Sequence, residues 1–386
     1  MGGKQQREST LLRLAAVGLE SEFSLFVDDK EERPEDVFRD PRAFLRGDLS
    51  HRTGTSYQLP TGAAVYFDTG VIEVATPLIE LERGCVARAG RSLWESIGCV
   101  RQGLDGWERR HGRTTRMVGF STHYNVSIEG RRTARSLDAL AKLLTYILPA
   151  PVMLLALNKE SSGVGVRPRG DRIEVTADFT PSSTLMVAAG SLITGIVRDV
   201  ATWPSFGVRE LRRRGLPRAN GFAPIPHTSR KGWLARVDCY PENPISAPDH
   251  APLRTMALQI FRYFQRSIAR IADPFSLRLI HAVLTGRAPS LLDLPGRPPE
   301  YEDVGRLCAW QAFYPDALLE HSRFERVVMN ALAKETLWID GEEYSPTGMR
   351  GWSRIAFRRH RDGEQLTMHI EDLLDHLHRW GNSNRR

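Results

Sequence analysis

The sequence predicts an α+β protein, with an antiparallel sheet covered by helices on one face and a smaller, mostly helical C-terminal region. Five segments alternate between apolar and polar side chains, with the two-residue period of strands that have one buried face. Longer segments between them carry apolar residues at steps of three and four, which is typical of amphipathic helices. The 386 residues, 41% of them hydrophobic and 26% charged, suffice for one large domain and a smaller one.

The first predicted strand is GLESEF, residues 18–23. Its alternation places Glu20 and Glu22 on one face and Leu19, Ser21 and Phe23 on the other. Two neighbouring carboxylates repel each other, and burying them without a partner is costly. Such a pair indicates either open solvent or a bound cation.

A second strand is predicted after a polar, proline-containing stretch, residues 28–59, which we interpret as a long loop or small excursion. The segment AAVYFDTGVIEVATP, residues 63–77, places Tyr66 and Asp68 on one face. Gly70 is expected to form a bulge that returns Glu73 to the same polar side. A long amphipathic helix over residues 82–111 is then expected to cover a face of the sheet.

The next strand is GFSTHYNVSI, residues 119–128, with Phe120 on its largely apolar face. Its opposite face carries four polar side chains: Ser121, His123, Asn125 and Ser127. Ser136 is predicted to cap the following helix. The glycine- and arginine-rich segment 159–171 lacks a Walker A sequence, so a flexible hairpin is favoured there over a phosphate cradle.

RIEVTADF, residues 172–179, has the cleanest alternation, with Arg172, Glu174, Thr176 and Asp178 on its polar face. A helix is predicted over residues 182–200. The basic segment 209–218 is interpreted as a solvated helix end, with docking of an acidic protein tail or nucleic acid as the alternative. WLARVDC, residues 233–239, adds a strand with Arg236 and Asp238 on its polar face.

The C-terminal third changes character. It predicts helices over residues 253–271, 324–334 and 365–380, joined by proline-rich segments. A boundary between residues 275 and 300 divides the chain into expected domains 1–285 and 286–386.

Composition narrows the setting of the protein. Its four cysteines include no CxxC pair, which argues against a disulfide framework or a zinc site and fits a reducing cytoplasm. The apolar run over residues 140–157 is interrupted by Lys142, Pro149 and Pro151, so it predicts two buried helices and no membrane span. The net charge of +7 suits an anionic partner without specifying one.

The polar sides of the five strands share one chemistry. An antiparallel sheet with one solvated face would show the same alternation. A face that is merely wet normally carries Lys, Thr and Gln, however, whereas carboxylates and a histidine dominate here. Such oxygen ligands suit magnesium, which prefers carboxylates together with phosphate oxygens and water.

Four of these motifs, taken in order over about residues 18–180, resemble one superfamily. GLESEF resembles the GxExE strand that opens the catalytic domain of carboxylate-amine ligases of glutamine synthetase fold, including glutamate-cysteine ligase and the Pup ligase. GAAVYFDTGVIEVATP resembles the Pup ligase and depupylase segment with a tyrosine, an aspartate and a glutamate, here Tyr66, Asp68 and Glu73. FSTHYNVS is similar to their His/Asn strand, and RGDRIEV to their strand with an arginine and a glutamate, here Arg169 and Glu174. Thr69, Gly70 and Val71 replace the family's histidine-rich stretch.

The resemblance implies a curved sheet whose concave face binds Mg²⁺ and ATP. Asp68 would then be the catalytic base, oriented with Tyr66. The implied metal ligands are Glu20, Glu22, Glu73, His123 and Glu174. The implied contacts to nucleotide, phosphate or substrate carboxylate are Arg169, Arg172, Asn125, Ser127 and Arg236.

Each assignment has a simpler alternative. Glu22 could pair with a surface lysine, Tyr66 could belong to the core, and His123 could be a hydrogen-bonded buried histidine. For the whole protein, the first hypothesis is an ATP-dependent amidoligase that joins a carboxylate to an amine, with a small acidic protein or peptide among its substrates. The alternatives are an amide or isopeptide hydrolase of the same fold, and a basic nucleic-acid-binding module. The interval between the first strand and Tyr66 resembles that of the ligases, which favours ligation, and nucleic acid is not the expected partner.

Overall fold

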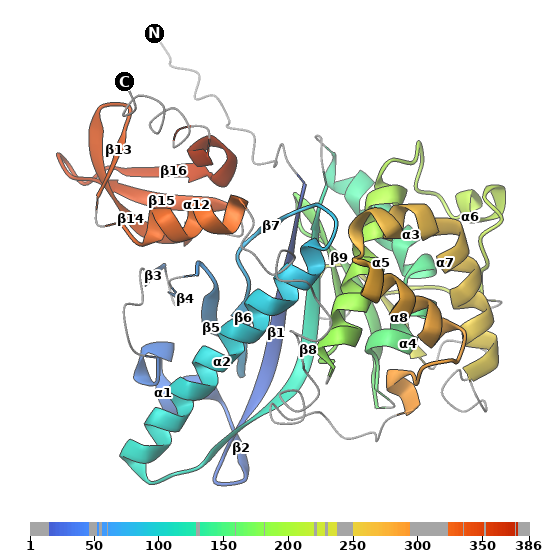
Figure 1. Ribbon diagram of the computed structural model, residues 1–386, viewed down its shortest axis with the longest axis horizontal. Helices are drawn as coiled ribbons and strands as arrows, with labels where there is room; N and C mark the ends of the chain where they lie inside the picture. The colour runs from blue at the N-terminus through green and yellow to red at the C-terminus, as the bar shows by residue number, and fades with distance from the viewer. Residues whose placement is uncertain are drawn as a thin grey trace.

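The fold is dominated by one large antiparallel sheet (Figure 1). The computed structural model describes residues 15–45, 52–53, 56–59, 61–128, 132–158, 160–180, 182–219, 222–227, 231–237, 250–293, 323–334, 336–350, 353–374 and 376. Within them, 12 strands pair in the order β11-β12-β9-β10-β8-β1-β6-β5-β4-β3, with β2 and β7 also pairing with β1. These strands are β1 (Ala16–Val27), β2 (Lys30–Glu32), β3 (Arg52–Thr53), β4 (Ser56–Gln58), β5 (Ala64–Asp68), β6 (Val71–Ala75), β7 (Ile79–Glu80), β8 (Thr115–Ser127), β9 (Gly163–Pro168), β10 (Arg172–Asp178), β11 (Ile225–Pro226) and β12 (Trp233–Arg236).

Helices cover the apolar face of this sheet in two layers. The inner layer is α2 (Cys85–His111), α3 (Ala134–Ile147), α4 (Pro149–Ala156) and α5 (Ser183–Ala201). Figure 1 shows α2 crossing in front of β1 and β6, while the other three gather beside β8 and β9. The outer layer, α7 (Ala251–Ile271) and α8 (Pro274–Leu284), packs on α4 and α5. The α+β class and the helix-covered antiparallel sheet predicted from the sequence are therefore confirmed.

The two central strands, β1 and β8, pair along almost their whole lengths, with Glu20 opposite His123 and Glu22 opposite Ser121. The register then shifts, because Phe23 lies opposite Gly119, and Phe120 is the extra residue of a β-bulge. The prediction that Phe120 lies on the apolar face is wrong, since its side chain is 60% exposed. Strict alternation fails here because one inserted residue breaks the two-residue period.

A tight hairpin joins β5 to β6, where the sequence predicted one bulged strand. Thr69 and Gly70 form its two-residue turn, with positive φ angles of 51° and 97°. Such a turn matches the twist of antiparallel strands, and Gly70 adopts this conformation without a Cβ penalty. The hairpin places Tyr66 directly opposite Glu73, so the two share a face, as expected from the sequence.

Several other local predictions need correction. Residues 28–59 include β2, α1 (Pro34–Phe38), the 3₁₀ helix η1 (Pro41–Ala43), β3 and β4, so the stretch is more structured than a loop. Thr133 rather than Ser136 caps α3, because its side chain accepts a hydrogen bond from the Ser136 amide at 3.1 Å. The expected flexible hairpin at 159–171 contains β9, which pairs with β10 and β12.

The apolar run over residues 140–157 forms two buried helices, as predicted: the end of α3 and then α4, bent by 63°. In the part of the chain that the structure describes, α5 is long and apolar enough to cross a membrane by length and composition. However, 83% of its most apolar window is buried inside the fold.

The described C-terminal residues contain a second sheet where the sequence predicted mostly helix. Its strands pair in the order β13-β14-β15-β16, namely β13 (Leu337–Ile339), β14 (Glu342–Arg350), β15 (Arg354–Arg359) and β16 (Gln365–His369). The helix predicted over 324–334 is present as α12 (Arg323–Leu332). The helix predicted over 365–380 is wrong in its first part, because residues 365–369 form strand β16, and only residues 370–374 after them are continuously helical. The remaining described elements are the short helix α6 (Arg209–Arg213) and the 3₁₀ helix η4 (Leu291–Asp293). Asp238 and residues 294–322 lie outside the described residues, and the domain boundary stays a prediction.

The second sheet packs against the large one. Phe324 and Val328 of α12 share a buried cluster with Ala16 and Leu78. The Met349 amide of β14 donates a buried hydrogen bond of 2.8 Å to Oε1 of Gln58 in β4. β14 is thereby fixed at one end of the polar face of the large sheet.

Candidate functional site

The polar face of the large sheet gathers carboxylates and a histidine from neighbouring strands. His123 of β8 lies between two carboxylates of β1, with its Nδ1 3.2 Å from Oε2 of Glu20 and its Nε2 3.6 Å from Oε1 of Glu22. The Ser121 hydroxyl donates to Oε2 of Glu22 at 2.6 Å and lies 3.0 Å from Nε2 of His123. His123 and Glu22 are 3% and 2% exposed, so the contacts form in a largely water-free environment.

The next strands extend this cluster. Glu73 of β6 lies opposite Glu22, and the Tyr66 hydroxyl of β5 donates to Oε1 of Glu73 at 2.6 Å. Burial and then the charge of Glu20 raise the pKa of Glu73 to about 9, with a further contribution from the charge of Glu22. Burial and the nearby carboxylates also raise the pKa of Tyr66 well above 10. At neutral pH, Glu73 therefore holds a proton in the absence of a cation.

Glu20 shows the opposite behaviour. Burial would raise its pKa, but the hydrogen bond and charge of His123, together with the charge of Arg172, lower that pKa to about 2. One carboxylate in the cluster is therefore ionised while its neighbour is protonated, which is the usual result when like charges are forced together.

Arginines border the cluster on the β9–β10 side. Glu174 of β10 forms ion pairs with Arg167 and with Arg169, whose Nε and Nη2 lie 2.9 and 3.2 Å from its carboxylate oxygens. Arg172 donates from its Nε to Oδ1 of Asn125 at 2.7 Å. Both Glu174 and Arg167 are almost fully buried.

Two overlapping sets of side chains could hold a metal ion. Glu20, His123 and Glu174 form one set, and Glu22, Glu73 and His123 form the other, each with potential ligand atoms within 4.8 Å of one another. Oε1 of Glu22 is buried and accepts no hydrogen bond from the described residues. An orphaned carboxylate oxygen and a proton-bearing neighbour fit a small hard cation such as Mg²⁺, which would replace the proton. Glu174 fits less well as a ligand, because two guanidinium groups already bind it.

Two cavities flank the cluster on the polar face. The first, about 400 Å³, is lined by Glu20, Tyr66, Asn125 and Arg172, and on its far side by Met349 and Arg350 of β14. The second, about 480 Å³, is lined among others by Glu22, His123, Phe120, Glu160 and Asp178. Asp178 accepts hydrogen bonds from the Asn158 amide at 2.8 Å and the Ser161 hydroxyl at 2.9 Å, and burial raises its pKa to about 6.

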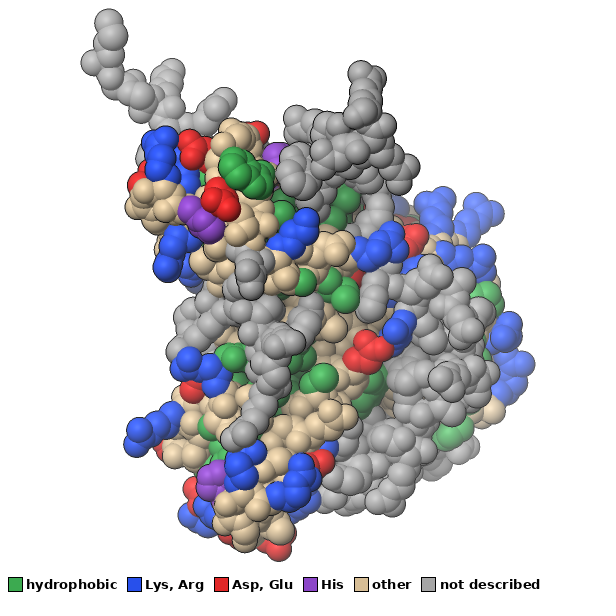
Figure 2. All heavy atoms as spheres, turned by 60° about the vertical axis from the view of Figure 1, so that its left-hand side comes forward, with side chains coloured by type: hydrophobic (Ala, Val, Ile, Leu, Met, Phe, Trp, Pro, Cys, Tyr) green, Lys and Arg blue, Asp and Glu red, His purple; other side chains and the backbone are tan. Residues whose placement is uncertain are grey.

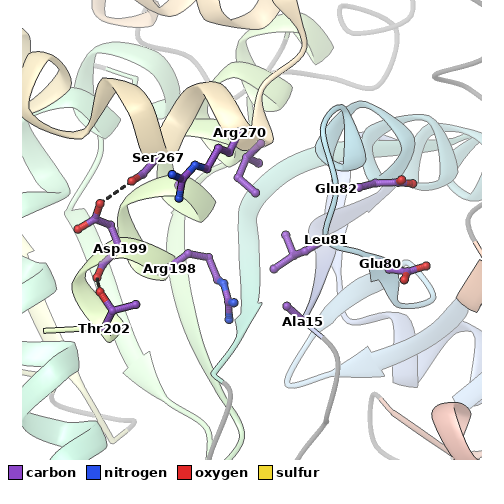
Figure 3. Close-up of a pocket in the computed structure, with 11 residues that line it drawn as sticks. Ala15, Glu80, Leu81, Glu82, Arg198, Asp199, Thr202, Ser267 and Arg270 are labelled. Atoms are coloured by element: carbon purple, nitrogen blue, oxygen red, sulfur yellow. Dashed lines mark hydrogen bonds between the residues drawn. The ribbon is translucent and has the colours of Figure 1, made fainter.

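A third cavity, about 530 Å³, lies between α5, α7 and the segment around β7 (Figure 3). It contains charges of both signs, including Arg198, Arg270, Glu80 and Glu82. Its Asp199 carboxylate already accepts hydrogen bonds from Ser267 and from Nε1 of Trp203, the latter at 3.0 Å. No residue of the carboxylate cluster lines it.

The structure thus brings together most of the residues proposed from the sequence. The assembled set is Glu20, Glu22, Tyr66, Glu73, His123, Asn125, Arg169, Arg172 and Glu174. Three others lie apart from it. Asp68 follows Tyr66 by two residues, beside the hairpin, where the Thr69 hydroxyl contacts it at 3.0 Å, and it lines neither flanking cavity. Ser127 is buried and accepts the Ala16 amide at 2.7 Å, and Arg236 is exposed on β12, which β9 and β10 separate from β8.

Some site residues were missed in the sequence. Arg167 was assigned to a flexible hairpin, although Val164 and Val166 alternate with it and indicate a strand. Asp178 and Ser121 were placed on the polar face without a role. Arg350 gave no signal, because its contribution depends on how β14 packs against the large sheet.

Charge on the outer surface is mixed. On the face that Figure 2 shows, the Lys and Arg side chains of the described residues lie among Asp and Glu on the left-hand side, whereas the right-hand edge carries mostly Lys and Arg.

Comparison with known proteins gives a fold. No protein-family model and no curated protein matches the sequence. Among solved structures, the complex of the prokaryotic ubiquitin-like protein Pup with its ligase PafA matches with a TM-score of 0.51 and 11% identity. The match covers 95% of this chain and 93% of that chain. The chain therefore has a Pup ligase-like fold, of the glutamine synthetase type.

Proposed function

We propose that this protein is an ATP- and Mg²⁺-dependent amidoligase that joins a carboxylate to an amine. The observation that carries the proposal is the cluster of Glu20, Glu22, Glu73 and His123, in which a buried carboxylate oxygen of Glu22 accepts no hydrogen bond from the described residues. Such a centre is costly without a cation, and in a ligase fold a cation has a clear use.

The reaction would proceed in two steps. An oxygen of the substrate carboxylate attacks the terminal phosphorus of ATP, ADP leaves, and an acyl phosphate forms. The amine nitrogen then attacks the acyl carbon, phosphate leaves, and the amine proton passes to a base. Bound Mg²⁺ would supply positive charge to the phosphate oxygens.

The side chains at the cluster suit these demands. Arg172 and Arg350 line the cavity beside Glu20 and present guanidinium groups to a polyphosphate. Asp68, on the same sheet face as Tyr66, is proposed as the base; because it lines neither flanking cavity, a water molecule would have to carry the amine proton to it. We propose a small acidic protein or peptide as the source of the carboxylate, a choice supported by the presence of Pup in the matching complex.

ADP release is the direct test. The protein is incubated with Mg²⁺, ATP and an amine, together with free amino acids or acidic peptides as the carboxylate source. We expect carboxylate-dependent ADP formation in wild type, its loss in Glu22→Gln, and no change in Glu31→Gln, which alters an exposed carboxylate of β2. Absence of ADP with every carboxylate, or equal rates in the two variants, would refute the ligase.

Hydrolysis of an amide is the alternative on the same fold. In that case water replaces the amine, and a fluorogenic amide or isopeptide is cleaved without consumption of ATP. Cleavage that depends on Glu22, together with no ADP release, would favour the hydrolase.

A further inference from the structure

Phe120 occupies an unusual position for a large aromatic side chain. It lies inside β8, a 13-residue strand in which it is the only exposed residue. The bulge opposite Glu22 and Phe23 turns its side chain out of the apolar layer, where strict alternation would have placed it. Exposure of a phenyl ring costs free energy in the absence of a ligand, so its position beside the carboxylate cluster suggests a contact surface.

The ring forms part of the wall of the 480 Å³ cavity. Three carboxylates also line this cavity: Glu22, Glu160 and Asp178. Arg167 is the only Lys or Arg among the described residues of its lining, and it forms an ion pair with Glu174, which Arg169 also contacts. Among its described lining residues, carboxylates therefore outnumber guanidinium groups.

The 400 Å³ cavity on the other side of the cluster has the opposite character. Among its described lining residues, Arg172 and Arg350 outnumber the one carboxylate, Glu20. A polyphosphate is attracted to the arginine-lined cavity and repelled by the carboxylate-lined one. An anionic ligand is therefore expected in the 400 Å³ cavity and a cationic ligand in the 480 Å³ cavity, on opposite sides of the cluster.

We propose that the 480 Å³ cavity binds the amine substrate, with its nitrogen beside Asp178 and its hydrocarbon chain on the ring of Phe120. The inference rests on the proposed ligase function and specifies the second substrate as an amine that carries an apolar chain. An ammonium group is attracted by both the carboxylates and the face of an aromatic ring. Asp178 is fixed for this contact by Asn158 and Ser161, and its oxygens retain further acceptor capacity.

The ring makes Phe120 a specificity-determining residue. An alkylamine gains contact with the phenyl surface, whereas ammonia has no chain to place there. Removal of the ring should therefore weaken the binding of long-chain amines and leave the binding of ammonia unchanged. Because Phe120 is exposed, Phe120→Ala leaves no cavity in the core and should fold normally.

The test measures ADP formation with ammonium chloride, methylamine and n-butylamine as amines, at fixed carboxylate. Phe120→Ala should raise the KM for n-butylamine about tenfold, which corresponds to the loss of one well-packed contact, and leave the KM values for ammonium and ATP unchanged. Asp178→Asn, which keeps an acceptor for the Asn158 amide, should raise the KM for all three amines. Trp338→Ala removes an exposed aromatic side chain of the second sheet and serves as the matched control.

Binding of n-butylamine, followed by ligand-observed NMR in wild type and Phe120→Ala, separates this inference from the ligase proposal. Phe120-dependent binding without ADP formation would support the amine pocket and refute the ligase. If the protein forms ADP but Phe120→Ala does not change the KM for n-butylamine, the proposed amine pocket is wrong. A rise in the KM for ATP alone would also overturn it, because Phe120 would then contact the nucleotide base.

Discussion

Replacement of Glu73 by glutamine should stabilise the metal-free protein at alkaline pH. Burial and the charge of Glu20 raise the pKa of Glu73 from 4.5 to about 9. The folded state therefore binds this proton more tightly than the unfolded chain does. The stability that binding of this proton contributes is complete below pH 4.5 and is lost as the pH rises towards 9. Glutamine keeps an acceptor for the Tyr66 hydroxyl but never carries the charge.

The pKa shift sets the size of the effect. At pH 8, which is 3.5 units above 4.5, the raised pKa of Glu73 lowers the free energy of unfolding by at most about 5 kcal/mol. At pH 5.5 the same loss is about 1 kcal/mol. Neighbouring side chains and water rearrange around an ionised Glu73 and reduce this loss. We therefore expect Glu73→Gln to raise the free energy of unfolding by roughly 2 kcal/mol at pH 8.

Urea unfolding in EDTA at pH 5.5 and pH 8 measures this difference. Glu73→Gln should be more stable than wild type at pH 8, and its advantage should shrink at pH 5.5. Glu31→Gln, on the exposed strand β2, should match wild type at both values. A stability gain that is independent of pH, or a loss of stability at pH 8, would refute the reasoning about the buried proton.

Three further substitutions test other parts of the site. Glu174→Gln removes the carboxylate that Arg167 and Arg169 bind, and should lower the free energy of unfolding by about 3 kcal/mol in urea; an unchanged value would show that the buried ion pair contributes nothing. Gly119→Ala places a Cβ 2.1 Å from Cδ1 of Phe179 and should cost roughly 1–3 kcal/mol in the same assay, whereas a neutral result would contradict the close packing beneath the bulge. Arg350→Ala should raise the KM for ATP about tenfold, with the exposed Arg358→Ala as control, and equal KM values in both would exclude Arg350 from the nucleotide cavity.

The sequence predicted the polar face well where strands are regular. In β1, β8 and β10 the two-residue period places Glu20, His123 and Glu174 on one side of the sheet, and pairing only has to align them. Tyr66 and Glu73 were also predicted correctly to share a face, although a hairpin rather than a bulge produces the arrangement. Local chemistry was sufficient in these cases because each residue's side depends only on its neighbours.

Other features depend on distant contacts. The bulge at Phe120 arises from pairing with β1, and a single strand carries no sign of the extra residue. β9 was missed because Gly163 and Gly165 leave only Val164, Val166 and Arg167 to show the alternation, although close strand packing favours glycine there. Arg236 shows the reverse error: its face was argued correctly from alternation, but the order of the strands puts β12 far from the cluster.

The hydrogen bond between Met349 and Gln58 has a consequence for how the protein is made. β4 is translated well before β14, because Met349 lies 291 residues further along the sequence than Gln58. The carboxylate cluster on β1, β6 and β8 can assemble long before then, but the arginine-lined cavity is completed only when β14 docks. A nascent chain would therefore contain the carboxylate cluster before the arginine-lined cavity, so translation of β14 is a precondition for the proposed binding of a polyphosphate.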